Sequence, residues 1–267
     1  MKYMEKEKQG SADWAPSGNG QPNAQSPASH SAAKTKGLYT MLGITMKSGR
    51  VYGISGKTGT GKTTAATQFL VEGAELGERG IMVLAGERGE EYVRNAKTFS
   101  FSFDKYYESG AIAVIDLSEE FWERKDALGS PTGQNDYIKS LSSSLGRYVN
   151  EHNTARMAID GITTLLNGEE DLTTMLFSAL KDAAPKCKIL ATSIVRDDGL
   201  SFYGVEEYKV DGLVRLDTGS DGTRTATIVK IRGAGYDPKP FEYAITSAGI
   251  VPLEKRNFDY LRKLPTA

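Results

Sequence analysis

Residues 56–63 of this 267-residue chain read GKTGTGKT, and this stretch decides the fold class that the sequence predicts. It matches the pattern G-x-x-x-x-G-K-[ST] at every fixed position. A short β-rich run, Val51–Ser55, comes directly before it, and the apolar residues of Lys62–Leu76 recur at spacings of three and four. A strand, a glycine-rich loop and an amphipathic helix in this order are typical of a phosphate-binding loop.

The residue types of this loop suit the binding of a nucleotide together with Mg²⁺. Glycines let consecutive backbone N–H groups point at a phosphate chain, and the positive end of the following helix faces the same anion. Lys62 would reach the β- and γ-phosphates, and the Thr63 hydroxyl would bind the metal. No Asn-Lys-x-Asp motif for guanine is present, so we expect ATP. The predicted nucleotide-binding residues are Gly56, Lys57, Thr58, Gly59, Thr60, Gly61, Lys62, Thr63 and Thr64.

The magnesium site of such a loop needs a carboxylate at the end of a neighbouring strand. The short apolar run Arg156–Ile159 ends in Asp160, and we predict that Thr63 and Asp160 together hold the metal. Asp116, which follows the run Ala111–Ile115, is the alternative, although an acid there would also suit the start of a loop.

Hydrolysis of ATP also needs a group that orients the attacking water. Glu87 follows the β-rich run Ile81–Ala85, and the second strand of such folds often lies close to the strand before the loop. We therefore predict that Glu87 is catalytic, together with Lys62. The alternative is structural, because Glu87, Glu90 and Glu91 could together stabilise the N-terminus of the next helix.

Strand-like runs alternate with helical patterns from residue 37 to residue 211, and only strand-like runs follow. Alternation of this kind predicts crossover units and a parallel sheet, and the later strands predict antiparallel pairs. We expect an α/β fold with a mostly parallel central sheet, flanking helices and antiparallel strands at its C-terminal end. The predicted strands are Val51–Ser55, Ile81–Ala85, Ala111–Ile115, Arg156–Ile159, Lys188–Thr192, Leu213–Asp217, Thr223–Ile231, Phe241–Ile245 and Ile250–Leu253, and the predicted helices are Lys62–Leu76 and Asp136–Asn153.

The composition limits the domain organisation and the location of the chain. Residues 1–36 contain no Ile, Leu or Val, so we predict a disordered N-terminal tail followed by one domain over 37–267. The 33 basic and 34 acidic residues argue against a protein that wraps nucleic acid by bulk charge. A single cysteine, two histidines and no long apolar run argue against disulfides, zinc and a membrane span, so we expect a cytoplasmic protein.

From about Leu42 to Leu253 the chain resembles the KaiC-like branch of the RecA-fold ATPases, in single-domain form. The phosphate-binding loop is shared by many ATPases, whereas the YGVEE and K-x-R-G segments are more specific. The segments that carry the resemblance are GKTGTGKTT (56–64), YVRNAKTF (92–99), Ile159-Asp160, YGVEE (203–207), VKIRG (229–233), FEYAI (241–245) and Gly249-Ile250.

The resemblance implies a RecA-like P-loop core in a homo-oligomeric ring, expected to be a hexamer, with ATP at the subunit interfaces. It also implies a protein partner that the sequence does not identify. In the family a Lys and an Arg of the K-x-R segment reach the γ-phosphate of the neighbouring subunit, and here these would be Lys230 and Arg232, catalytic residues in trans. Strand alternation agrees, since Val229 and Ile231 facing inward would put both cations on the opposite face. The alternative is an ordinary solvated strand face.

Two positions depart from the family pattern. The family usually has two adjacent Glu after the second strand, and this chain has Gly86 before Glu87, so hydrolysis could be slow or absent. Where the two-domain clock protein phosphorylates itself on Ser and Thr, this chain has Glu206 and Glu207, so we expect no autokinase activity there.

We therefore expect an ATP-binding and ATP-hydrolysing protein that acts as a nucleotide-dependent oligomeric switch. One alternative is a RecA/RadA-like DNA-binding recombination accessory, which would need a basic loop after Lys188–Thr192. The segment Arg196–Asp211 is net acidic instead, so nucleic acid is not an expected partner. The other alternative, motivated by Gly86, is an ATP sensor that does not hydrolyse its ligand.

Overall fold

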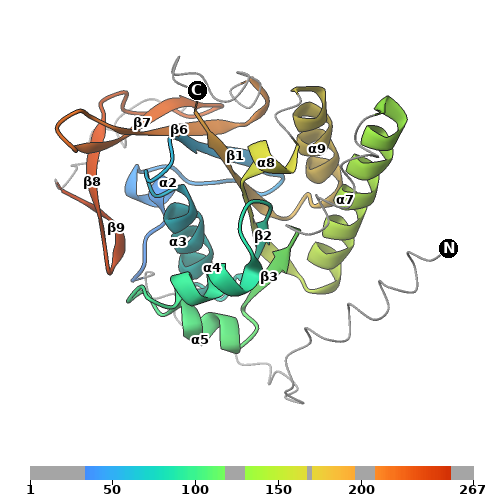
Figure 1. The fold of residues 1–267 in the computed structure, drawn as a ribbon, viewed down its shortest axis with the longest axis horizontal. Helices are drawn as coiled ribbons and strands as arrows, with labels where there is room; N and C mark the ends of the chain where they lie inside the picture. The colour runs from blue at the N-terminus through green and yellow to red at the C-terminus, as the bar shows by residue number, and fades with distance from the viewer. Residues whose placement is uncertain (1–33, 118–129, 167–169, 196–207, 254–267) are drawn as a thin grey trace.

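The computed structural model describes residues 34–117, 130–166, 170–195 and 208–253, and these form a nine-stranded sheet with helices on both faces (Figure 1). The predicted α/β class is confirmed. The strands are β1 (Arg50–Gly56), β2 (Arg79–Leu84), β3 (Ile112–Asp116), β4 (Thr154–Asp160), β5 (Lys188–Ile194), β6 (Gly212–Thr218), β7 (Arg224–Ile231), β8 (Phe241–Thr246) and β9 (Gly249–Pro252). The helices are α2 (Leu38–Met41), α3 (Lys62–Glu75), α4 (Gly89–Ala96), α5 (Phe103–Glu108), α7 (Pro131–Glu151), α8 (Ile162–Leu165) and α9 (Glu170–Ala183).

The strand order is β3-β2-β4-β5-β1-β6-β7-β8-β9. Strands β1 to β6 pair in parallel, and β7, β8 and β9 continue the sheet by antiparallel pairing. All nine predicted strands are present, with ends that differ by one or two residues in most cases. The C-terminal ends of the parallel strands lie along the same side of the sheet, so the loops that follow β1, β2 and β4 lie near one another there.

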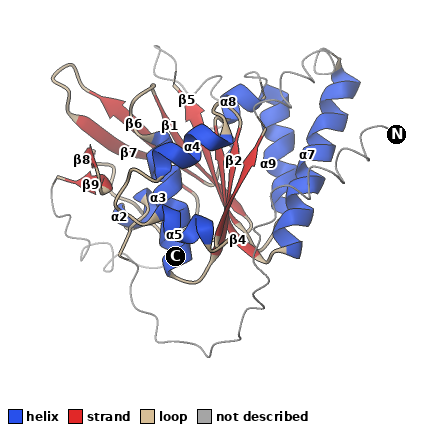
Figure 2. Cartoon of the chain, turned by 60° about the horizontal axis from the view of Figure 1, so that its bottom comes forward, coloured by secondary structure: helices blue, strands red, loops and turns tan. Residues whose placement is uncertain are grey.

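Helices cover both faces of the sheet (Figure 2), and each face carries one apolar cluster. The first cluster packs α3, α4 and α5 on one face, and the second packs α7, α8 and α9 on the other. Helix α9 was not among the predicted helices, although Leu172, Leu176 and Leu180 recur at helical spacing and are buried. Across the described residues, no helix is long and apolar enough to cross a membrane.

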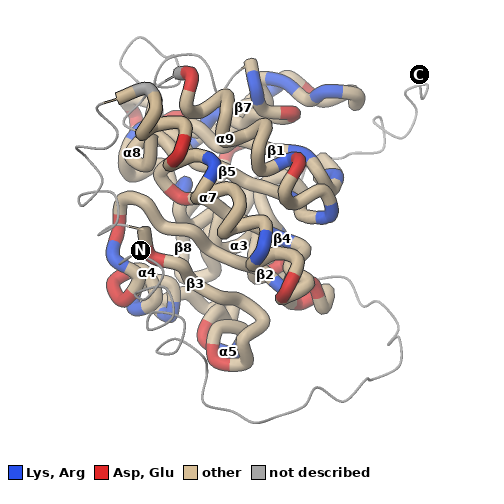
Figure 3. Tube along the Cα trace, turned by 90° about the vertical axis from the view of Figure 1, so that its right-hand side faces the viewer, with Lys and Arg blue, Asp and Glu red and all other residues tan. Residues whose placement is uncertain are grey.

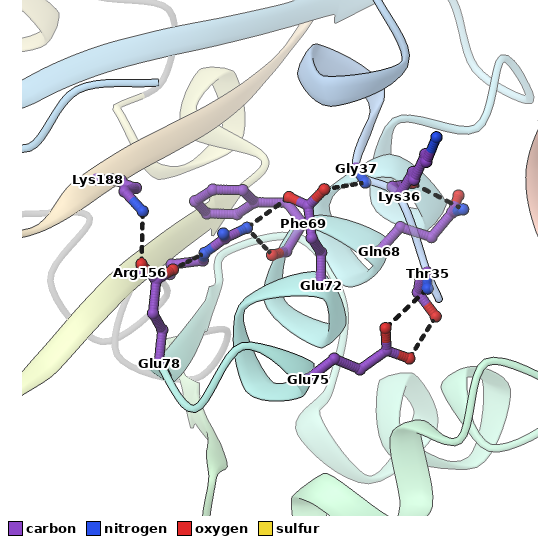
Figure 4. A network of polar contacts seen from close by, with 10 residues as sticks. All are labelled: Thr35, Lys36, Gly37, Gln68, Phe69, Glu72, Glu75, Glu78, Arg156 and Lys188. Atoms are coloured by element: carbon purple, nitrogen blue, oxygen red, sulfur yellow. Dashed lines mark hydrogen bonds and ion pairs between the residues drawn. The ribbon is translucent and has the colours of Figure 1, made fainter. Parts of the chain in front are cut away.

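A chain of buried and partly buried ion pairs links α3 to β4 and β5 in the middle of the sheet (Figure 4). The Arg156 guanidinium on β4 donates to Glu72 of α3 at 2.7 Å and to Glu78 at 2.5 Å, and Lys188 on β5 donates to Glu78 at 2.6 Å. The Arg156 side chain is only 5% exposed, and it also lies over the ring of Phe69. Removing one partner of a buried pair such as Arg156–Glu72 lowers the free energy of unfolding by about 3–5 kcal/mol. The cluster therefore stabilises the packing of α3 against β4.

The segment that leads into the domain is bound to the same helix (Figure 4). Both the backbone N–H and the hydroxyl of Thr35 donate to the Glu75 carboxylate, at 2.8 and 2.9 Å, and Gly37 N donates to Glu72 at 3.1 Å. The expected boundary after residue 36 therefore falls inside a segment that contacts α3. Residues 1–33 lie outside the described residues, and their disorder stays a prediction.

Two N-terminal deletions distinguish the contribution of residues 1–33 to stability from that of the contact between Thr35 and Glu75. Deleting residues 1–33 should leave the melting temperature and ATP binding nearly unchanged, because that stretch has too little apolar content to form core. Deleting residues 1–36 should lower the melting temperature, because each lost hydrogen bond to a charged group contributes roughly 1.5–3 kcal/mol. Thermal melts of both proteins test this, and a drop of many degrees for the shorter deletion would show that the tail packs.

Candidate functional site

The glycine-rich loop connects the end of β1 to the start of α3, and its lysine folds over the loop backbone. Lys62 Nζ donates to the carbonyl oxygens of Gly56 and Lys57, both at 2.8 Å. Burial lowers the pKa of Lys62, and the nearby Asp160 carboxylate opposes that shift. Gly61 has φ 90°, and a Cβ there would meet Ile245 Cδ1 at 2.8 Å, so glycine is required at this turn.

The predicted metal residues are in direct contact. Thr63 Oγ1 donates to Asp160 Oδ2 at 2.7 Å, although the two are 97 residues apart in the chain. Only β5 lies between β1 and β4, so the ends of these parallel strands bring the loop and Asp160 together. A hydroxyl and a carboxylate are the hard oxygen donors that Mg²⁺ prefers. No group of three or more His, Cys, Asp or Glu side chains that could hold a metal occurs within the described ranges. Mg²⁺ in nucleotide sites is usually held by one or two protein oxygens together with substrate phosphates and water.

Asp116 serves a different purpose. It ends β3, the edge strand, and β2 lies between β3 and β4. Its Oδ2 accepts a hydrogen bond from Gly89 N, the first residue of α4, at 2.6 Å. A carboxylate at this position stabilises the helix N-terminus, so the structure brings Asp160, and not Asp116, to Thr63.

Glu87 lies in the loop that follows the C-terminal end of β2. The prediction that β2 lies close to β1 is wrong, since β4 and β5 separate them, but the Asp160 charge still acts on Glu87. Burial raises the pKa of Glu87, the Asp160 and Glu91 charges add to this, and a 3.0 Å hydrogen bond from Asn95 Nδ2 opposes it. The first turn of α4 contains Glu90 and Glu91, whereas Glu87 precedes the N-cap residue Arg88. Glu87 is therefore outside that turn, and it follows β2, whose last residue, Leu84, pairs with Asp160 of β4.

Gly86 leaves room for a side chain beside Glu87. A Cβ built on Gly86 would have Thr164 as its neighbour, with the nearest atom at 3.6 Å, which is ordinary van der Waals contact. The backbone there is not left-handed. The position therefore accepts a Cβ atom without a clash.

The β8–β9 hairpin packs against the loop and α3, a contact that the sequence reasoning missed. Tyr243 on β8 donates its hydroxyl hydrogen to the carbonyl of Thr60 at 2.6 Å. Gln68 of α3 accepts from Ile250 N at 2.7 Å and donates to Ile250 O at 3.2 Å. The sequence predicts strands at Phe241–Ile245 and Ile250–Leu253, but it carries no local motif that would indicate their contact with the loop.

Lys230 and Arg232 lie away from the phosphate-binding loop of their own chain. Gly56 pairs with Leu216 of β6, whereas Arg232 N donates to Asp211 O at 2.7 Å, at the start of that strand. Leu216, beside the loop, and Asp211, beside Arg232, are five residues apart, which is about 16 Å along the strand direction. Lys230 pairs with Leu213, about 10 Å from the level of the loop by the same spacing.

The predicted alternation of β7 is wrong at this place. A register shift between Leu213 and Val214 interrupts the β6–β7 pairing. Val229 consequently packs against the second cluster and Ile231 against the first, so these two residues face opposite sides of the sheet. A β-bulge of this kind adds an unpaired residue, and a sequence pattern of period two does not reveal it.

The comparisons with known proteins agree with this site. Residues 33–257 match the family described as "ATPase: KaiC". The chain belongs to the KaiC family of ATPases. A UPF0273 protein of Thermotoga maritima is 31% identical over 209 residues, which cover 74% of this chain and 85% of that protein. The circadian clock oscillator protein KaiC of Synechococcus elongatus is 26% identical over 212 residues, which cover 76% of this chain and 40% of that protein.

A solved structure shares the KaiC-family fold. The crystal structure of a KaiC-like protein from Pyrococcus horikoshii superimposes with a TM-score of 0.68 and 25% identity, covering 85% of this chain and all of that one. The RecA-superfamily fold is thereby confirmed. Of the family-specific segments, residues 92–99 place Tyr92 in the core, where its hydroxyl lies 3.0 Å from Thr67 Oγ1 of α3. Residues 203–207, with Glu206 and Glu207, and most of the acidic segment 196–211 lie outside the described residues.

Proposed function

We propose that this KaiC-family chain is a Mg²⁺-dependent ATPase that acts as a nucleotide-dependent oligomeric switch. The observation that carries the proposal is the 2.7 Å contact between Thr63 and Asp160, beside the amino group of Lys62. These side chains come from the end of β4 and the N-terminus of α3, and together they supply the oxygen donors and the positive charge that a Mg²⁺–triphosphate needs.

We propose further that each ATP lies between two subunits of a ring, expected to be a hexamer, with Lys230 and Arg232 of one subunit serving the loop of the next. The support is geometric, because these cations lie about 10 and 16 Å along the sheet from their own loop. A head-to-tail contact would bring them to a neighbouring loop, and such contacts close into rings. Charges that arrive from a neighbour stabilise the transferring phosphoryl group only after assembly, which makes hydrolysis depend on oligomeric state.

Phosphate release and light scattering on the same sample test the proposal. With ATP and Mg²⁺ we expect phosphate release and a particle several times the mass of one subunit, and with EDTA we expect neither. A monomer that releases phosphate at the same rate at every protein concentration would contradict the interfacial site.

Gly86 favours a second candidate, an ATP sensor that hydrolyses slowly or not at all. Gly86→Glu restores the pair of acids that the family usually has, and a Cβ at this position meets only Thr164, at ordinary van der Waals distance. A positioned general base contributes roughly 10²–10⁴-fold to a rate, so we expect phosphate release to rise at least tenfold. Gly86→Gln is the matched control, since it adds the same volume without a base. Equal rates for both variants would mean that Gly86 does not limit hydrolysis.

The charge distribution gives no support to DNA binding. Acidic and basic segments are interspersed along the described trace (Figure 3), and the formal net charge is -1. Filter binding at low salt should therefore retain no DNA.

We also propose that the chain does not phosphorylate itself at residues 206–207. Incubation with labelled ATP should leave these positions without a stable label, because a glutamate could form only a labile acyl phosphate and not the stable phosphate ester of Ser or Thr.

A further inference from the structure

Thr192, the fifth residue of β5, is bonded to the carboxylate oxygen of Asp160 that Thr63 does not contact. Its Oγ1 donates to Asp160 Oδ1 at 2.5 Å and accepts from Gly161 N at 2.9 Å. The residue is 1% exposed. The two oxygens of Asp160 are thus each bonded to a threonine hydroxyl, Oδ2 to Thr63 of α3 and Oδ1 to Thr192 of β5.

The bonding pattern fixes the direction of the Thr192 hydroxyl. A threonine hydroxyl has one hydrogen, and it rotates to suit its partners. Gly161 N is a donor and occupies a lone pair of Oγ1, so the hydroxyl hydrogen is directed at Asp160. Gly161 has φ 86°, which glycine adopts without strain, and this turn aims its N–H back at β5.

The Asp160 carboxylate needs such a contact to hold one orientation. Rotation about the Cβ–Cγ bond of aspartate has a broad energy profile, so the torsion itself leaves the carboxylate plane undetermined. Mg²⁺ requires near-ideal octahedral geometry, so a ligand that turns out of position binds it more weakly. Side chains that orient metal ligands typically change metal affinity by about 10–100-fold when they are removed.

We propose that Thr192 is a positioning residue that orients Asp160 for Mg²⁺ and thereby sets the Mg²⁺ affinity of the nucleotide site. This inference rests on the proposed function. Within the described part of the chain, the Thr192 hydroxyl bonds to Asp160 and Gly161 and not to Lys62, so its effect is on the metal and not on the binding of nucleotide alone.

Thr192→Val tests this, because valine keeps the branched shape of the strand residue and removes the hydroxyl. Calorimetric titration of ADP is carried out first in EDTA and then at a series of Mg²⁺ concentrations, on the full chain. We expect the variant to bind ADP in EDTA as the wild type does, and to need about 10–100-fold more Mg²⁺ for the same gain in ADP affinity. Raising Mg²⁺ should also restore its phosphate release, which a general loss of structure would not allow.

Three further variants separate the hydroxyl from the packing. Thr192→Ser and Thr192→Ala differ by one oxygen atom, so serine should keep the wild-type Mg²⁺ requirement and alanine should raise it, even if the valine variant does not fold. Thr154→Val is the matched control, because Thr154 is a buried threonine at the other end of β4. It should leave the Mg²⁺ titration unchanged.

The outcomes distinguish this inference from the function on which it rests. If the wild-type protein responds to Mg²⁺ and the serine and alanine variants respond identically, the positioning role is wrong and the ATPase proposal stands. If ADP binding by the wild type is independent of Mg²⁺, both fail together.

Discussion

Lys62→Ala is expected to abolish ATP binding at ordinary concentrations. The substitution removes the point charge that the loop places on the β- and γ-phosphates, and losing a contact of this kind costs on the order of 2–5 kcal/mol, or about 30- to 4,000-fold in affinity. The fold should persist, because burial lowers the pKa of Lys62, which means that the charged lysine destabilises the empty site at neutral pH. Calorimetry with ATP and a thermal melt of the empty protein measure the two effects.

Lys47→Ala is a suitable control for this experiment. Lys47 is an exposed lysine before β1, at the opposite end of that strand from the loop. It should bind ATP as the wild type does. An affinity of Lys62→Ala within a few-fold of the wild type would refute the assignment of residues 56–63 as a nucleotide site.

Arg232→Ala subunits and Glu87→Gln subunits should each be nearly inactive alone and should recover activity when mixed. Loss of an arginine that acts in trans costs roughly 10³–10⁵-fold in rate. Glu87→Gln keeps an oxygen that can accept from Asn95, and it removes only the charge that burial and Asp160 already disfavour, so its fold should be intact. Arg232→Ala should also spare nucleotide binding by the isolated subunit and weaken ATP-dependent assembly.

The recovery has a calculable size. In a ring of head-to-tail contacts mixed at random in equal parts, about a quarter of the interfaces join an intact Glu87 to an intact Arg232. The control replaces the Arg232→Ala subunit by one that carries both substitutions, since no interface is then complete. Absence of recovery in rings that native mass spectrometry shows to be mixed would mean that Arg232 serves its own loop or that Glu87 does not orient water.

The strands and the loop could be predicted because their signals are local. The run before Gly56, the glycines and the helix after Lys62 are adjacent in sequence, and apolar periodicity alone located the nine strands. The β-bulge beside Val229 could not be predicted in this way, because it arises from the pairing of β6 with β7. Neither could the order of β2, β4, β5 and β1, which depends on how the crossovers pack over the sheet.

The candidate site likewise has features that local sequence signals predict and features that depend on strand order and pairing. The sequence by itself indicated the phosphate-binding loop and the residue types that suit Mg²⁺, since these depend on residues within a few positions of one another. It also indicated the family, through several short segments whose order and spacing are specific. The tertiary structure alone decided that Asp160 and not Asp116 meets Thr63, that Thr192 holds the other oxygen of that carboxylate, and that Arg232 lies far from its own loop. Strand order and register bring together or separate side chains that are distant in the chain, and a hydrogen bond depends on that distance in space.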